Sequence, residues 1–184
     1  MSIQTAEDLL SEVLQRNEQR FAKGPASPTP VLGQPPSLHY AVIQSAQSVF
    51  AKMCGVELEL LEQTELACAA RHNDVSGIIA ISGALQASVS LHFEQNLIFA
   101  CSEKFLGTRP TKLDPESIDL VGELTNRVVG SAKERLAQDG LSLSLPTVVA
   151  GFGHQVAMGS GMLVSAITFG SPAGHLSINV GIKQ

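Results

Sequence analysis

Residues 119–136 read DLVGELTNRVVGSAKERL and predict an amphipathic helix. At about 100° per residue, the apolar residues of this stretch fall on one side, as in a helix that packs on a core. They are Val121, Leu124, Val128, Ala132 and Leu136. The other side carries, within roughly 80°, a polar stripe made of Asp119, Glu123, Asn126, Gly130 and Lys133. We therefore expect the helix to bury one face and to present its functional groups on the polar stripe.

Two features of the polar stripe point to chemistry with a partner. A glycine inside a helix costs about 1 kcal/mol relative to alanine, so Gly130 predicts a place where another molecule comes close to the backbone. Glu123 and Asn126 are three residues apart and are therefore neighbours on the helix surface. An amide donates and accepts hydrogen bonds at once and can hold a water molecule, while a carboxylate can pair with a cation of the partner. The alternative is an ordinary solvated helix face.

Such a pair suits a hydrolysis in which the phosphoryl group and its metal ion arrive on another protein. Catalysis of this kind is mostly positioning of the attacking water. The chain offers no metal-binding spacing among its five histidines, and its three cysteines, Cys54, Cys68 and Cys101, are too widely spaced for a zinc site. We therefore expect buried reduced thiols and no cofactor or metal of the protein's own.

Composition narrows the class of protein. The chain has 184 residues, of which 44% are hydrophobic and 16% charged, and a net charge of −5. This composition predicts one folded domain with an appendage, and the acidic balance without basic clusters disfavours nucleic acids and anionic membranes as partners. The sequence also lacks a signal-peptide pattern and an apolar run long enough to span a membrane. We therefore expect a cytoplasmic protein.

The chain divides at a proline-rich segment. Residues 5–23 predict an amphipathic helix, and residues 24–36, GPASPTPVLGQPP, predict an extended linker because proline at this density cannot continue a helix. The sequence therefore predicts an N-terminal helix and linker over 1–36, tethered to a domain over 37–184.

Within the domain, the elements follow a repeated order. Ser37 is expected to cap a helix that Gly55 ends, and Asp114 a helix that starts at Pro115 and continues to about residue 138. Strands are predicted at 56–70, 76–83, 87–95, 141–149, 161–170 and 174–183, and a further helix at 96–107. A long helix followed by three strands thus occurs twice. We predict an α+β domain, internally duplicated, with long helices packed on an antiparallel sheet.

Two smaller expectations concern individual positions. His92 lies on a strand of alternating polarity and is expected to face solvent. The glycines of residues 151–161, GFGHQVAMGSG, lack the context of a phosphate-binding loop and predict a connection between strands.

The chain resembles the CheX-type chemotaxis phosphatases within the wider CheC/CheX/FliY family. Their hallmark is an acid or serine, three residues, Glu, two residues, then Asn, with a proline further along the chain. Here DLVGELTN supplies Asp119, Glu123 and Asn126. Pro146, in LSLPTVVAG, follows somewhat sooner than the family pattern has it. The resemblance covers about residues 37–184 and also includes SGIIAISG before the central hairpin.

The resemblance implies dephosphorylation of the aspartyl phosphate of a CheY-like response regulator. Asn126 would orient the attacking water, and Glu123 would pair with a lysine of the regulator, which also supplies the Mg²⁺. Asp119, Gly130 and Lys133 would dock the partner. A homodimer joined through sheet edges is also implied. The alternative is a catalytically silent adaptor that docks on a response regulator or a signalling complex.

The predicted duplication raises the question of a second site on the first helix. With Asp119 placed over His39, the positions of the glutamate and the asparagine fall on Ile43 and Ala46, which can neither pair with a lysine nor hold a water. Other registers offer Gln44 and Gln47 without an acid one turn earlier. We therefore predict one active site per chain.

Overall fold

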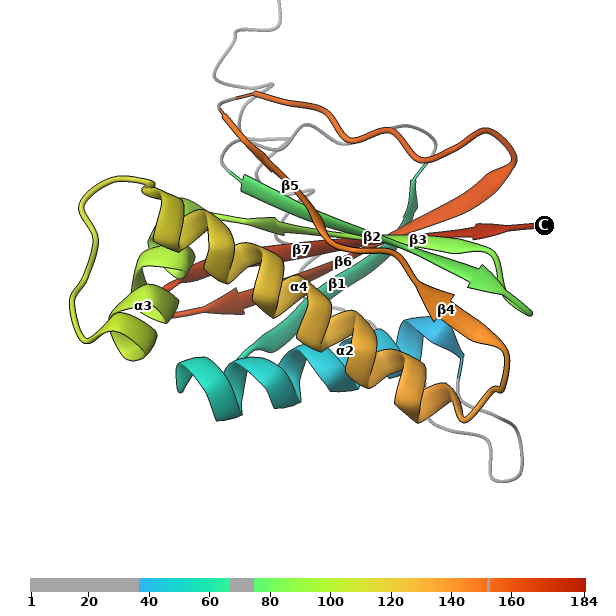
Figure 1. Ribbon diagram of the computed structural model, residues 1–184, viewed down its shortest axis with the longest axis horizontal. Helices are drawn as coiled ribbons and strands as arrows, with labels where there is room; N and C mark the ends of the chain where they lie inside the picture. Colours follow the sequence, from blue (N-terminus) through green and yellow to red (C-terminus); the bar gives the residue numbers. More distant parts are fainter. Residues whose placement is uncertain (1–36, 67–74, 152) are drawn as a thin grey trace, which may run out of the picture.

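The computed structural model describes residues 37–66, 75–151 and 153–184. The helix and linker predicted over 1–36 lie outside these residues, and so does Cys68, so the division into a tethered segment and a domain stays a prediction. Within the described ranges, the fold is the predicted α+β arrangement of helices on one antiparallel sheet (Figure 1). None of the helices described has the length and apolar character that crossing a membrane requires.

The described residues form a sheet of seven strands, and every described pairing is antiparallel. The strands are β1 (Glu59–Leu66), β2 (Val75–Gly83), β3 (Ala87–Phe93), β4 (Leu141–Leu143), β5 (Thr147–Ala150), β6 (Met162–Ser171) and β7 (Gly174–Lys183). Their order is β1-β6-β7-β3-β2-β4, with β5 also paired to β2. The pairs β2–β3 and β6–β7 each form an antiparallel hairpin.

The helices lie on one face of the sheet (Figure 1). They are α2 (Leu38–Val49), which continues as the short π-helix η1 (Phe50–Cys54), α3 (Gln95–Leu106) and α4 (Pro115–Leu136). The predicted starts are confirmed, since the Ser37 hydroxyl accepts a hydrogen bond from the Tyr40 N–H and Asp114 Oδ1 accepts one from the Ser117 N–H. Gly55 ends η1 in the left-handed region with φ of 65°, as glycine allows.

The strand order is consistent with the predicted duplication. Exchanging β1 with β4, β2 with β6 and β3 with β7 turns the order into its own reverse. The helices α2 and α4 pack side by side, so each unit contributes one long helix to the same layer. The predicted strand at 141–149 is, however, two strands, because β4 and β5 pair with different parts of β2 and leave Ser144, Leu145 and Pro146 between them.

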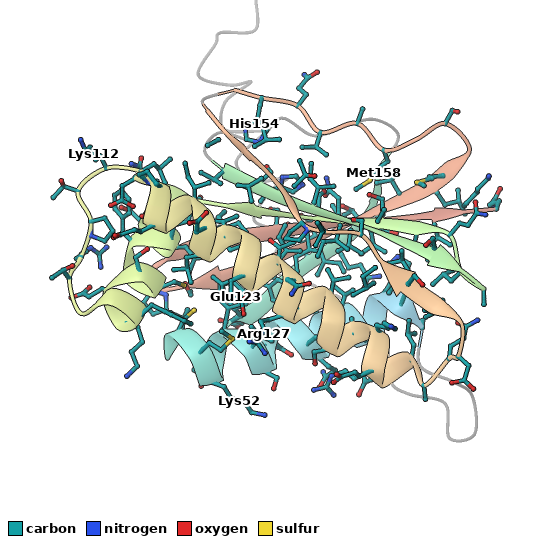
Figure 2. All side chains as sticks on the ribbon, viewed as in Figure 1. Lys52, Lys112, Glu123, Arg127, His154 and Met158 are labelled. Carbon is teal, nitrogen blue, oxygen red and sulfur yellow. The ribbon has the colours of Figure 1, made fainter. Side chains whose placement is uncertain are left out.

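Part of the second face of the sheet is covered by the described residues between β5 and β6, which cross it opposite the helices (Figures 1 and 2). Met158 on this segment lies over Gly181 of β7, where an added Cβ would be 3.3 Å from Met158 Cγ. His92 points to this face and is only 5% exposed. The expectation that His92 faces solvent is therefore wrong. Strand alternation placed His92 opposite the helices, but it could not reveal that a distant loop covers that face.

A chain of hydrogen bonds ties the covering segment to the sheet. The Ser76 hydroxyl lies 2.6 Å from His92 Nδ1 and 2.6 Å from His154 Nε2. His92 Nε2 lies 2.7 Å from the Ser90 hydroxyl, and His154 Nδ1 lies 2.7 Å from the Gly151 carbonyl oxygen.

When each imidazole carries one hydrogen, the donors in this chain of hydrogen bonds can point in only one direction. The Gly151 carbonyl can only accept, so His154 Nδ1 donates to it and His154 Nε2 accepts from Ser76. Ser76 has then used its hydrogen and accepts from His92 Nδ1, so that His92 Nε2 accepts from Ser90. Ser76 thus joins the two histidines.

Replacing Ser76 by alanine is expected to lower the free energy of unfolding by about 1–3 kcal/mol, because His92 and His154 each lose the hydrogen bond to Ser76. Urea denaturation checks this result. Ser82→Ala is the matched control, since Ser82 is an exposed serine on the same strand and should change stability by less than about 0.5 kcal/mol. Equal stability of both variants would contradict the role of the chain.

Candidate functional site

The helix α4 holds the polar stripe rigidly because its opposite side is packed. All five residues predicted for the apolar side are buried: Val121, Leu124, Val128, Ala132 and Leu136. The predicted helix is thus confirmed, except that it ends at Leu136 rather than near residue 138, with Ala137 in the left-handed region.

A close approach between α4 and β2 sets the height of the helix above the sheet. Thr125 is fully buried and donates from Oγ1 to the Val121 carbonyl oxygen at 2.7 Å. Gly77 of β2 lies directly beneath it, and a Cβ on Gly77 would overlap Thr125 Oγ1. The absence of a side chain at Gly77 therefore lets α4 come close to the strand.

The break between β4 and β5 brings Pro146 to the helix. The Ser144 N–H donates to the Ala80 carbonyl oxygen at 2.9 Å, and the Ser144 hydroxyl accepts from the Ala80 N–H at 3.0 Å. Pro146 then lies beside α4, where its Cγ would be 4.0 Å from a Cβ built on Gly122. Proline cannot donate to a sheet ladder, so its place in this gap is physically expected. The motif's glutamate follows Gly122 directly.

The polar stripe is accessible along its length. Asp119 and Asn126 are exposed, and Glu123, Gly130 and Lys133 are partly exposed. A Cβ built on Gly130 would meet no atom of the residues that the structure describes within 4 Å. Internal packing therefore does not require glycine at this position, in contrast to Gly77.

Glu123 forms an ion pair with Arg127 in which Arg127 Nε lies 2.6 Å from Glu123 Oε1. Arg127 is a residue that the sequence analysis missed. The signal was present, since an acid and a base four residues apart on a helix are neighbours. Figure 2 shows both side chains on the side of α4 toward α2.

The two residues that follow Glu123 by one turn lie on opposite flanks of it. At about 100° per residue, Arg127 is rotated about 40° from Glu123 toward α2, where Ser131 meets Ser45 at 3.2 Å. Asn126 is rotated about 60° the other way, toward the Gly122 side on which Pro146 lies. The carboxylate is thus drawn away from Asn126 when it pairs with Arg127.

The first long helix offers no comparable pair. Ile43 is 4% exposed and Ala46 is fully buried, so both belong to the core. Gln44 and Gln47 are half-buried, and Gln47 Nε2 donates to the Leu58 carbonyl oxygen at 3.0 Å. This amide stabilises the connection to β1. The packing of α2 therefore supports the prediction of one active site per chain.

The described cysteines do not form a reactive site. Cys54 and Cys101 are both buried, as expected. The hydrogen bond with Cys54 and, to a smaller extent, burial raise the pKa of the Cys101 thiol. The thiol therefore stays protonated and unreactive. Within 37–66, 75–151 and 153–184, no three metal-binding side chains gather at one place.

Comparison with known proteins identifies the family. Residues 75–170, which include the whole of α4 and the Pro146 segment, match the model of the family described as chemotaxis phosphatase CheX. The chain belongs to the CheX family. No match was found among curated proteins.

Solved structures of CheX and CheC-like proteins share the fold. A CheC-like superfamily protein from Shewanella sp. PV-4 is 32% identical with a TM-score of 0.74, over 80% of this chain and 97% of that chain. The chemotaxis protein CheX from Vibrio vulnificus is 31% identical with a TM-score of 0.72, over 79% and 99%. CheX from Borrelia burgdorferi, solved in complex with CheY, BeF3 and Mg²⁺, is 16% identical with a TM-score of 0.69, over 80% and 99%. The last likeness concerns the fold alone.

Proposed function

We propose that this CheX family member is a phosphatase that hydrolyses the aspartyl phosphate of a CheY-like response regulator in the cytoplasm. The observation that carries the proposal is the accessible pair Glu123 and Asn126 on a helix whose other face is buried. An amide fixed on a rigid element can hold a water in line with a phosphoryl group, and such positioning accounts for most of the catalysis in phosphoryl transfer. The complex of the Borrelia CheX with CheY supports the choice of partner.

In this proposal Asn126 enters the active site of the regulator and orients the attacking water, and Glu123 pairs with a lysine of the regulator. The regulator supplies the Mg²⁺, which neutralises charge on the phosphoryl oxygens. Asp119 and Lys133 contact the partner at the edges of the polar stripe. Gly130 leaves the open space that a close approach needs, since a Cβ built there would meet no described residue within 4 Å.

The test is phosphate release from CheY-like regulators that have been phosphorylated with acetyl phosphate in the presence of Mg²⁺. The proposal expects this chain to accelerate release from at least one of them in substoichiometric amounts. An adaptor would bind the regulator without acceleration. Binding without turnover across the panel would therefore replace the phosphatase by the adaptor.

We also propose a homodimer joined through a sheet edge. In the described part of the chain, β1 stands at one end of the strand order and pairs only with β6. An unpaired strand edge is a surface on which a second copy can add its own strand. The molar mass in solution at micromolar concentration is expected to be that of two chains, and a monomer would contradict this proposal.

A further inference from the structure

We propose that Arg127 competes with the cation of the response regulator for Glu123 and thereby sets the affinity of the site for its partner. This inference rests on the proposed function and adds a residue that the motif does not include. It begins from the contact of 2.6 Å between Arg127 Nε and Glu123 Oε1, which engages one oxygen of the carboxylate that the proposed function assigns to the partner.

The ion pair between Arg127 and Glu123 stabilises the free protein slightly, and a cation of the partner can replace Arg127 in it. The side chain of Arg127 is 61% exposed and that of Glu123 42% exposed, so water screens the charges and both side chains lose rotamer freedom in the pair. A lysine of the partner can therefore displace Arg127 without first breaking a buried contact. Glu123 then exchanges Arg127 for the lysine in a single step.

The geometry places the two partners of Glu123 on different sides of it, with Arg127 bound to Oε1. Arg127 holds the carboxylate on the α2 side of the polar stripe, whereas Asn126 lies on the flank toward Pro146. A regulator whose active site receives Asn126 and whose lysine meets Glu123 needs the carboxylate turned toward Asn126. Turning the carboxylate that way opens its pair with Arg127, whose positive charge stays beside the incoming lysine.

This competition acts on binding rather than on the chemical step. The Arg127 pair is broken before the water attacks, so its cost is the same in the bound complex and in the transition state. Arg127→Gln is therefore expected to lower KM for the phosphorylated regulator about two- to fivefold, the range that an exposed ion pair allows. The value of kcat should stay unchanged. Arg127→Lys restores an i,i+4 pair and should return KM to that of the wild type.

Two controls separate this role from a general effect of charge. Arg135→Gln removes the same charge from α4, two turns further on, where Arg135 Nε donates to the Ser45 hydroxyl at 3.1 Å and not to Glu123. It should lower KM by less than Arg127→Gln does. In a Glu123→Gln background, where no carboxylate is left to compete for, Arg127→Gln should lose most of its effect.

The experiment measures KM and kcat with a regulator that has been phosphorylated by acetyl phosphate. It also measures binding of a BeF3-activated, Mg²⁺-bound regulator. Tighter binding in Arg127→Gln, reversed in Arg127→Lys, supports the inference. Unchanged or weaker binding, or an equal gain in the Glu123→Gln background, overturns it while wild-type turnover still stands. If the wild-type chain neither binds nor dephosphorylates any regulator, the proposed function and this inference fall together.

Discussion

Asn126→Ala is expected to lower the acceleration of regulator dephosphorylation by about 100-fold or more, because a misplaced attacking group alone costs on this order. Asn126 is exposed on α4, so the substitution removes no packing and the thermal midpoint should stay unchanged. Glu123→Ala should instead raise KM, since it removes the charge that pairs with the partner. Time courses of phosphate release at several regulator concentrations measure the lost acceleration and the change in KM.

The matched control is Gln138→Ala, which removes another exposed amide just beyond the same helix. It is expected to leave phosphate release unchanged. Full activity of Asn126→Ala would show that another group orients the water, and the assignment of Asn126 would then be wrong.

Gly77→Ala is expected to destabilise the domain by about 1–3 kcal/mol, in the range typical of overpacking in a core. The new Cβ would overlap Thr125 Oγ1 and lie 2.9 Å from Thr125 Cβ, and Thr125 is held by its bond to the Val121 carbonyl oxygen. The helix α4 must then move away from β2 and carry Glu123 and Asn126 with it. Urea denaturation measures the loss of stability, and phosphate release measures the displaced site.

Gly130→Ala provides the contrasting glycine on the same helix. The Cβ that this substitution adds would meet no described residue, so helix propensity should raise stability by up to about 1 kcal/mol, while contact with the regulator should become weaker.

In a Thr125→Ala background, Gly77→Ala should destabilise the domain less, because the two positions share one contact. Equal and additive costs would show that Thr125 does not limit the approach of α4.

Local signals were sufficient for the helices because they act within one turn. Asp114 caps α4 through its bond to the Ser117 N–H, and Pro115 follows it at the first helical position. The side of α4 that packs on the core was also predictable, since it follows from the spacing of apolar residues along the sequence. The ion pair between Glu123 and Arg127 belongs to this class as well, although the sequence analysis did not include it.

The strand predicted at 141–149 shows a feature that the sequence pattern did not predict, the break between β4 and β5. Its alternation continues through Ser144 and Leu145, but the structure interrupts the ladder there and brings Pro146 to Gly122. The interruption depends on which residues of β2 pair with each half. These pairing partners lie about 60 to 75 residues earlier in the chain, and no nearby residue encodes their register.

The sequence by itself determined the long helix, the face that it buries, and the presence of an acid and an amide on the other face, because each of these depends on residues within a few positions of one another. Only the tertiary structure decided that His92 is enclosed by the segment carrying His154, and that Gly77 lets α4 come close to the sheet. Burial on a sheet depends on what covers it, and the covering segment contacts β2 through His154 and β7 through Met158. These contacts join residues that are far apart in the chain.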